Sequence, residues 1–177
     1  KEYKKLFKKI DWIEGDINDL SSLDEAFENV NEVYHCAAFI SFNNQDLNAM
    51  KKINISGTAN MINCALDKKI SKFCYVSTIA AIGETTNSLI DEECEWKENN
   101  NPYSETKHYA ELEVWRGISE GLNAVIVNPG VIVGSGFWKR GSGAFITQVS
   151  RGMSYYPTGE TGFICVKDVV KIMIQLM

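Results

Sequence analysis

Short apolar runs alternate with segments of helical periodicity from one end of this sequence to the other, and no internal repeat is present. The apolar runs are bounded by polar residues, which is typical of strands, and they lie at residues 10–15, 32–38, 72–77, 122–127 and 163–166. Between them, apolar residues recur every three or four positions over residues 21–29, 47–65, 103–119 and 144–151, and again from residue 168. This alternation predicts an α/β fold with a doubly wound parallel sheet, in which the run at 32–38 is buried on both faces.

Composition limits the classes of protein to which this chain can belong. With 177 residues and 45% hydrophobic side chains, one globular domain with a buried core is expected. The net charge is −5, and the only basic run is a lysine cluster at residues 1–9, which argues against nucleic acid and membrane as partners. Acidic residues follow that cluster instead of an apolar segment, so we do not expect it to be a signal peptide.

The cysteines indicate a reducing compartment and no metal. They are five in number and widely spaced, and Cys36, Cys74 and Cys165 lie in apolar runs. We therefore expect reduced core thiols in a cytoplasmic protein. No two cysteines are two to four residues apart and only two histidines are present, so no metal site is expected.

A phenol and an amine stand four residues apart at Tyr103 and Lys107, in a segment of helical periodicity that Pro102 opens. Both side chains should leave one face of the helix. An ammonium near a phenol favours the phenolate and lowers its pKa, so that the tyrosine can exchange a proton with a substrate oxygen. Such a pair arises easily by chance, so its meaning depends on the residues around it.

Small or polar residues follow four of the expected strands. These positions are Asp16, Ala37-Ala38, Ser77-Thr78 and Asn128-Pro129-Gly130. In parallel α/β sheets, ligands bind beyond the carboxyl ends of the strands. The sequence therefore predicts a ligand site at this edge of the sheet.

Together these motifs resemble the extended short-chain dehydrogenase/reductase family, also called the NAD-dependent epimerase/dehydratase family. The landmarks occur in family order, at residues 15–17, 35–38, 54–60, 76–78, 103–107, 128–130 and 166–169. The resemblance implies a Rossmann-like fold and a nicotinamide cofactor, NADP or NAD. It also implies that Thr78 binds the substrate oxygen, that Tyr103 is the general acid or base, and that Lys107 binds the nicotinamide ribose and lowers the tyrosine pKa.

The same resemblance implies the residues that hold the cofactor. Asp16 and Ile17 would meet the adenine, Ala37 and Ala38 would pass under the pyrophosphate and ribose, and Asn54 would support the site. The nicotinamide would be lined by Pro129, Gly130 and Val131. Small residues at strand ends suit this role because they let a cofactor approach the backbone.

One departure from the family concerns its glycine-rich phosphate turn, which should precede the Asp16 strand. The first glycine of this sequence is Gly15, so we expect roughly 50 further residues ahead of it, the size of a strand, helix and strand. NAD and NADP are therefore not distinguished. We divide the chain into a partial dinucleotide-binding domain at residues 1–133 and the start of a substrate-binding lobe at residues 134–177.

Three functions remain open, and motifs such as residues 128–134 favour the dihydroflavonol reductase and hydroxysteroid dehydrogenase branch. The first function is reduction of a ketone or oxidation of a secondary alcohol, which involves a small-molecule substrate. The second is sugar-nucleotide epimerisation or dehydration with the cofactor recycled, and the third is a non-catalytic nucleotide sensor. We expect a homodimer, in which Val114, Trp115 and Ile118 would suit the interface.

Some of these assignments have alternatives. Ser77 is the alternative to Thr78 as the catalytic hydroxyl, and three other residues have structural interpretations. His35 lies among apolar residues and is expected to be a satisfied core histidine. Asn54 is as consistent with a structural role as with a ligand contact, and Asp168 is expected to be an N-cap.

Overall fold

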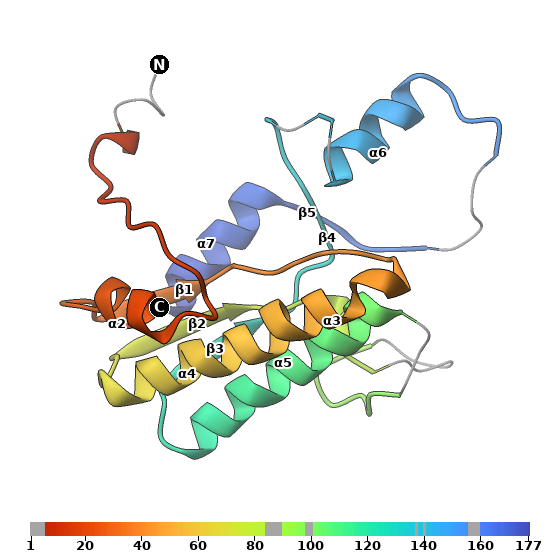
Figure 1. Ribbon diagram of the computed structural model, residues 1–177. Helices are drawn as coiled ribbons and strands as arrows, with labels where there is room; N and C mark the ends of the chain where they lie inside the picture. Colours follow the sequence, from red (N-terminus) through yellow and green to blue (C-terminus); the bar gives the residue numbers. More distant parts are fainter. Residues whose placement is uncertain (1–5, 84–89, 98–100, 137, 140, 156–159) are drawn as a thin grey trace.

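The computed structural model describes residues 6–83, 90–97, 101–136, 138–139, 141–155 and 160–177. Its centre is a parallel sheet in the order β1 (Glu32–His35), β2 (Lys72–Val76), β3 (Ala124–Val127). Figure 1 shows this sheet with helices α4 and α5 packed along it. The predicted α/β fold with parallel strands is confirmed.

Burial differs between the strands of this sheet. In β2, Phe73, Cys74 and Tyr75 are all buried, as expected for a strand covered on both faces. In β1, Val33 and His35 are buried but the alternate residues are exposed. The prediction that this strand is buried on both faces is wrong, because helices cover only one of its faces within the described residues.

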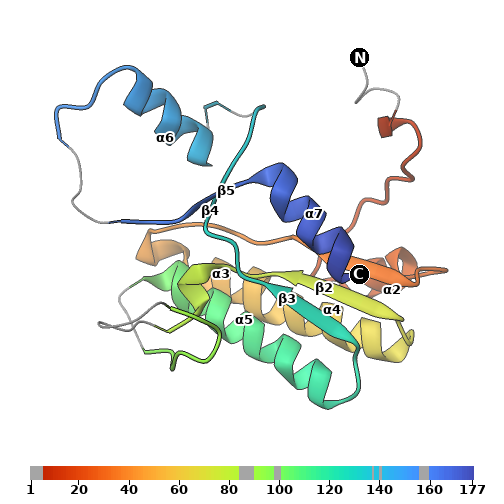
Figure 2. The same ribbon diagram turned by 180° about the vertical axis from the view of Figure 1, so that it is seen from behind.

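Helices lie on both sides of the sheet. On one side α4 (Gly57–Asp67) and α5 (Pro102–Ser119) pack against each other, and their buried side chains form one core cluster with side chains of β2 and β3. On the other side α7 (Val166–Leu176) lies across the sheet (Figure 2). Its Val169 and Met173 form a core cluster with Cys74 of β2. This is the doubly wound arrangement that the sequence predicts.

One predicted helix, residues 47–65, contains a change of geometry. It comprises α3 (Leu47–Met50), a π-helical stretch η2 (Lys51–Ser56) and α4. A π turn widens the helix locally and is frequent at functional sites. Here it contains Asn54, which is 1% exposed and therefore lies inside the protein.

Residues before β1 differ partly from expectation. Helix α2 (Leu20–Ala26) forms as predicted, with Asp19 as N-cap accepting a hydrogen bond from the backbone N–H of Ser21. Residues 11–16 form no strand. The predicted strand at 10–15 is wrong because a strand needs a paired neighbour, and in the described part of the chain β1 pairs only with β2.

The C-terminal region contains a second, smaller sheet in which β4 (Val131–Val133) pairs in parallel with β5 (Phe163–Cys165). Helix α6 (Gly141–Ser150) lies between them in sequence. Helix α7 begins at Val166, with Cys165 as N-cap. The prediction that Asp168 is an N-cap is therefore wrong, because Asp168 already lies in the first turn.

Short 3₁₀ turns, η1 (Asn44–Asp46) and η3 (Ile79–Ala81), complete the described elements. All five cysteines are unpaired, but only Cys74 is buried, so the expectation of core thiols is wrong for Cys36 and Cys165, which are exposed. Each of these two directly follows or ends a short edge strand. Among the described helices, none has the length and apolar character needed to cross a membrane.

The expected dimer face on α5 is only partly available. Val114 is fully buried in the core of this chain, because α5 turns that side chain toward the sheet and α4. The prediction that Val114 belongs to an interface between subunits is therefore wrong. Trp115 on the same helix is 52% exposed.

Candidate active site

Tyr103 and Lys107 lie on the first turns of α5, which starts where the sequence predicts. Pro102 occupies the start of the helix, and the side chain of Asn101 accepts hydrogen bonds from the N–H groups of Tyr103 (3.1 Å) and Ser104 (3.3 Å). This cap fixes the helix entry. Tyr103 is half-buried and Lys107 is only 2% exposed.

The ammonium of Lys107 is directed into the sheet. Its Nζ donates to the phenol oxygen of Tyr75 at 2.6 Å and to the carbonyl of Val76 at 2.9 Å, and it lies 4.2 Å from the centre of the Tyr75 ring. Burial lowers the pKa of Lys107 to about 8, and the carboxylate of Glu111 partly opposes this effect.

The pKa of Tyr103 moves in the opposite direction from the one expected. Burial raises the pKa of Tyr103, whereas a close ammonium would lower it. The expected lowering is not found because the ammonium of Lys107 bonds to Tyr75 and Val76 instead. The Tyr103 ring also meets Phe42 edge-on, with centroids 6.1 Å apart.

At the exit of β2, the two candidate hydroxyls have different environments. Ser77 is buried, and its hydroxyl donates to the Glu111 carboxylate at 2.5 Å. Thr78 is half-buried, and its Oγ1 accepts from the N–H of Ala80 at 3.2 Å. Asn128, which follows β3, donates to Glu111 at 2.9 Å and to the Thr78 carbonyl at 3.2 Å, so it holds the two strand exits together.

Asn54 joins three segments of the chain. Its Oδ1 accepts from the N–H of Phe39 at 2.7 Å, and its Nδ2 donates to the Phe39 carbonyl at 3.0 Å and to Thr106 Oγ1 at 3.1 Å. This side chain therefore fixes the segment that leaves β1 and ties it to α5. Its hydrogen bonds fit the structural interpretation of Asn54.

Gly57, Thr58 and Asn60 follow Asn54 in the chain, and they also hold other segments of the chain in place. A Cβ atom at Gly57 would lie 2.8 Å from Ile17 Cγ2, so glycine permits the close approach of α4 to that side chain. Asn60 donates to the Ile17 carbonyl at 3.2 Å. Thr58 Oγ1 lies 3.0 Å from Nε2 of His35. Burial lowers the pKa of His35 to about 4. His35 is a satisfied core histidine, as predicted.

Several expected cofactor-binding residues surround one cavity of about 360 Å³ at the exit of β1. Its walls include Asp16, Ile17, Ala37 and the side chain of His35. Asp16 accepts hydrogen bonds from the backbone and side chain of Asn18, which lower its pKa. A carboxylate beside exposed, small strand-end residues fits part of a nucleotide, so these residues could hold the dinucleotide.

Pro129, Gly130 and Val131 lie at the junction of the two sheets. The Pro129 carbonyl accepts from the N–H of Ile79 at 3.1 Å, and the N–H of Val131 donates to the carbonyl of Gly162 at 2.8 Å. A Cβ at Gly130 would come within 2.4 Å of that carbonyl oxygen, so only glycine fits there. The structure thus places these residues beside Thr78 but outside the cavity at the β1 exit.

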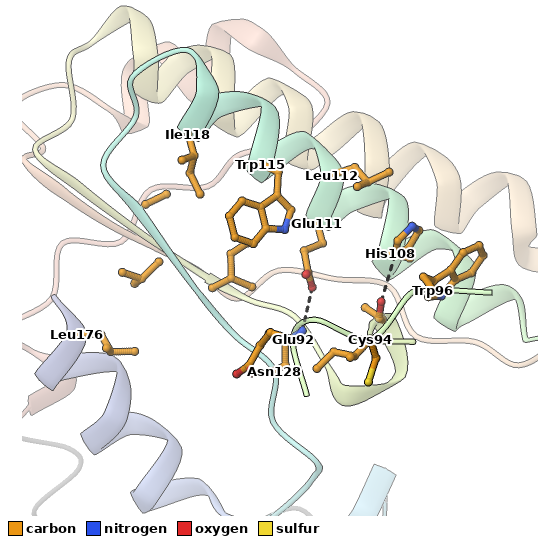
Figure 3. Close-up of a pocket in the computed structure, with 15 residues that line it drawn as sticks. Glu92, Cys94, Trp96, His108, Glu111, Leu112, Trp115, Ile118, Asn128 and Leu176 are labelled. Atoms are coloured by element: carbon orange, nitrogen blue, oxygen red, sulfur yellow. Dashed lines mark hydrogen bonds between the residues drawn. The ribbon is translucent and has the colours of Figure 1, made fainter. Parts of the chain in front are cut away.

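A larger cavity of about 590 Å³ lies between α5, β3, the end of α7 and the segment that contains Cys94 and Trp96. Figure 3 shows its aromatic and apolar walls, with Glu111 and Asn128 bonded to each other between Trp115 and Cys94. Trp96 stacks on His108 there, and within the described ranges its buried Nε1 has no hydrogen-bond partner. Thr78, Tyr103 and Lys107 do not line this cavity.

Sequence reasoning missed Tyr75, Glu111 and Asn128 as partners of the site. Glu111 follows Lys107 by four residues, so the helical period could have placed it on the same face. For Asn128 the sequence indicates a strand exit and a family landmark at residues 128–130, but not its hydrogen-bond partners. No sequence signal distinguishes Tyr75, which lies in an apolar strand and resembles a core residue.

A parallel sheet with helices on both faces, with small and polar residues at its strand exits, defines an α/β protein of the dinucleotide-binding class. The chain belongs to the NAD dependent epimerase/dehydratase family, whose model matches residues 1–177. The resemblance found in the sequence is therefore confirmed, and so is the expectation of a nicotinamide dinucleotide as cofactor. At this coarse level, the relatives are enzymes.

Named relatives and solved structures agree with this family. The chain is 32% identical over 128 residues to a Synechocystis protein provisionally named dihydroflavonol 4-reductase, covering 71% of this chain and 37% of the relative. The crystal structure of gox2253 matches with a TM-score of 0.82 at 31% identity, covering 90% of this chain and 50% of that one. The NAD complex of Thermus thermophilus UDP-glucose 4-epimerase matches with a TM-score of 0.78 at 21% identity, covering 95% and 60%.

The chain therefore spans between 37% and 60% of the length of these three proteins. The activity, substrates and partners of the whole protein are therefore proposals.

Proposed function

We propose that the protein containing this chain is an NAD(P)-dependent oxidoreductase that reduces a ketone or oxidises a secondary alcohol. The observation that carries the proposal is the position of Tyr103 one helical turn before a buried lysine, whose ammonium bonds to Tyr75 and Val76 of the strand leading to Thr78. The name of the Synechocystis relative supports the reductase alternative.

In this proposal, Thr78 and Tyr103 donate hydrogen bonds to the carbonyl oxygen of the substrate. The bound cofactor supplies the hydride. Tyr103 transfers its phenolic proton to the substrate oxygen as the alcohol forms, and the raised pKa of Tyr103 keeps that proton in place at neutral pH. The ammonium of Lys107, which bonds to Tyr75 and Val76, uses its remaining N–H to bind a ribose hydroxyl of the cofactor.

We favour Thr78 over Ser77 as the hydroxyl that binds the substrate. The Ser77 hydroxyl donates its only proton to Glu111, which leaves none for a substrate. The Thr78 hydroxyl oxygen accepts from Ala80, which leaves its proton available for donation.

For the cofactor, we propose that Asp16 and Ile17 contact the adenine and that Ala37 and Ala38 face the pyrophosphate and ribose. Pro129, Gly130 and Val131 would line the nicotinamide. The cavity at the β1 exit supports the first assignment. Asn54 would act by holding the β1 exit segment through Phe39, without touching the cofactor.

The test is Tyr103→Phe in the whole protein, assayed with a panel of ketones and secondary alcohols. We expect turnover to fall by about 10²- to 10⁴-fold, the usual contribution of a general acid or base, while the dissociation constant of the cofactor is unchanged. Tyr109→Phe, on the exposed side of the same helix, is the control and should keep its turnover. Unchanged turnover in Tyr103→Phe would refute the proposal.

The second candidate is epimerisation or dehydration of a sugar nucleotide, which the description of the matched family includes. The two candidates differ in cofactor balance. A reductase consumes one NAD(P)H for each alcohol formed, whereas an epimerase or dehydratase returns its cofactor to the starting state. Product formation without net change in absorbance at the nicotinamide band would favour the second candidate.

A further inference from the structure

Tyr75 is a buried tyrosine for which the proposed mechanism has no role. It lies near the end of β2 and is 1% exposed, with the apolar Phe73 and Cys74 before it. Its phenol oxygen accepts a hydrogen bond of 2.6 Å from Lys107, and the ammonium also lies over its ring at 4.2 Å from the centroid. The same side chain therefore contacts this cation in two ways, through oxygen and through the ring.

The phenol is also connected to the far side of the core. A hydrogen bond with Thr58 counteracts part of the rise that burial causes in the pKa of Tyr75. Thr58 in turn lies 3.0 Å from the ring nitrogen of His35, whose ring centroid is 5.3 Å from that of Tyr75. Polar side chains from β1, α4, β2 and α5 thus meet inside an otherwise apolar core.

We propose that Tyr75 is a positioning residue for the reaction, because its phenol holds the ammonium of Lys107 in place and keeps it protonated. This inference rests on the proposed function of Lys107. An ammonium has three N–H donors, of which Tyr75 and Val76 accept two, so the third can serve a ligand. Without the phenol oxygen, one of the two acceptors that fix this orientation is lost.

Burial keeps Tyr75 itself neutral, because it raises the pKa of that phenol. The phenol therefore accepts a hydrogen bond without taking part in proton exchange at neutral pH. Other groups also act on Lys107: Glu111 and Cys36 raise its pKa, and the positive charge of Lys107 contributes to the lowered pKa of His35. Loss of the Tyr75 hydroxyl removes a bond that favours the charged amine, so the pKa of Lys107 should fall further.

The test is Tyr75→Phe, which removes the oxygen and keeps the ring, with Tyr109→Phe as the control. The readout is the pKa of Lys107, followed by NMR through its ¹³C-labelled Cε and assigned by its disappearance in Lys107→Met. We expect the pKa to fall by about 1 unit in Tyr75→Phe, as for loss of one hydrogen bond to a charged group, and to stay constant in the control. An unchanged pKa of Lys107 in Tyr75→Phe would overturn the proposal.

The second readout is the pH profile of ketone reduction. If turnover needs charged Lys107, it falls as pH rises through the pKa of that amine, and in Tyr75→Phe this fall should begin about 1 unit lower. A uniform decrease at all pH values would indicate a purely structural role and would overturn the proposal. Tyr75→Leu, which also removes the phenol oxygen but leaves an apolar side chain at this buried position, should shift the profile in the same direction, and it provides the same test if Tyr75→Phe folds poorly.

The two proposals fail in different ways. If Tyr103→Phe keeps full turnover, the proposed function is wrong whatever the Lys107 titration shows. If Tyr103→Phe is inactive but Lys107 titrates identically with and without the Tyr75 hydroxyl, only the positioning role is wrong.

Discussion

The central sheet with α4 and α5 and the C-terminal region from β4 to α7 are built differently. Around the central sheet, the buried polar residues His35, Asn54, Ser77 and Lys107 all have hydrogen-bond partners. The C-terminal region instead exposes large apolar side chains: Phe145, Ile146, Val149, Phe163, Val170, Ile172 and Ile174. The central region encloses hydrogen-bonded polar groups in an apolar core, whereas most large apolar side chains of α6, β5 and α7 are exposed.

This difference separates the parts of the proposed mechanism. Catalytic side chains need supporting contacts that fix their rotamers and charges, and the central sheet provides them. The C-terminal region is anchored mainly through Val169 and Met173 of α7, so its other side chains are constrained less by the chain described. Three measurements test this contrast, and the largest expected effect comes first.

The largest expected effect comes from removing one phenylalanine in each region. Phe73 is fully buried in β2, whereas Phe163 in β5 is 53% exposed. Phe73→Ala should lower the free energy of unfolding by about 3–5 kcal/mol, because it leaves a cavity, and Phe163→Ala should change it by about 0.5 kcal/mol or less. Denaturant titration measures both. Equal losses would mean that the C-terminal region is as tightly packed as the central sheet.

The second expected effect is a pH dependence that arises from His35. Its pKa is about 4 in the folded protein and about 6.5 when unfolded, so the unfolded state binds the proton first as pH falls. The free energy of unfolding is therefore unaffected by the titration of His35 well above pH 6.5. It should decrease by about 3 kcal/mol on acidification to pH 4, because the unfolded state gains a proton that the folded state does not bind.

Urea titration between pH 7 and pH 4 measures this decrease, which should persist in His108→Gln and be much smaller in His35→Gln. The same slope in His35→Gln would show that carboxylates, rather than this histidine, cause the acid sensitivity.

The smallest expected effect compares one polar side chain from each region. Asn54→Ala removes three hydrogen bonds and leaves the N–H of Phe39 without its side-chain acceptor, so it should cost about 1–3 kcal/mol. Ser142→Ala in α6 removes one hydrogen bond, to the Ile132 carbonyl at 2.6 Å, and should cost about 0.5–1.5 kcal/mol. Thermal unfolding of both variants measures these losses of stability. A larger loss in Ser142→Ala than in Asn54→Ala would contradict the difference between the two regions.

The sequence predicted most of the fold because its elements are encoded locally. Asp19 and Pro102 mark helix starts, and the buried run of β2 is apolar on both faces. The strand expected at residues 10–15 failed because strand formation depends on a pairing neighbour, which no local pattern reveals. The prediction of an N-cap at Asp168 was wrong because an acidic residue suits the first turn of a helix as well as its cap.

The candidate site was predictable only at the level of residue types. Tyr103, Lys107 and Thr78 carry motif signals, whereas the partners of Lys107 depend on which β2 side chain meets α5 across the core. The direction of the Tyr103 pKa shift also depends on burial and on where the ammonium points. Spacing along a helix does not determine either quantity.

The π-helical stretch at Lys51–Ser56 implies a constraint on chain length during evolution. A single-residue deletion there would restore the regular helix and rotate every preceding side chain relative to α4, so that Asn54 would no longer face Phe39. A deletion in a surface loop has no such effect on distant side chains. Descendants of this gene should therefore tolerate substitutions in that stretch more readily than gains or losses of one codon.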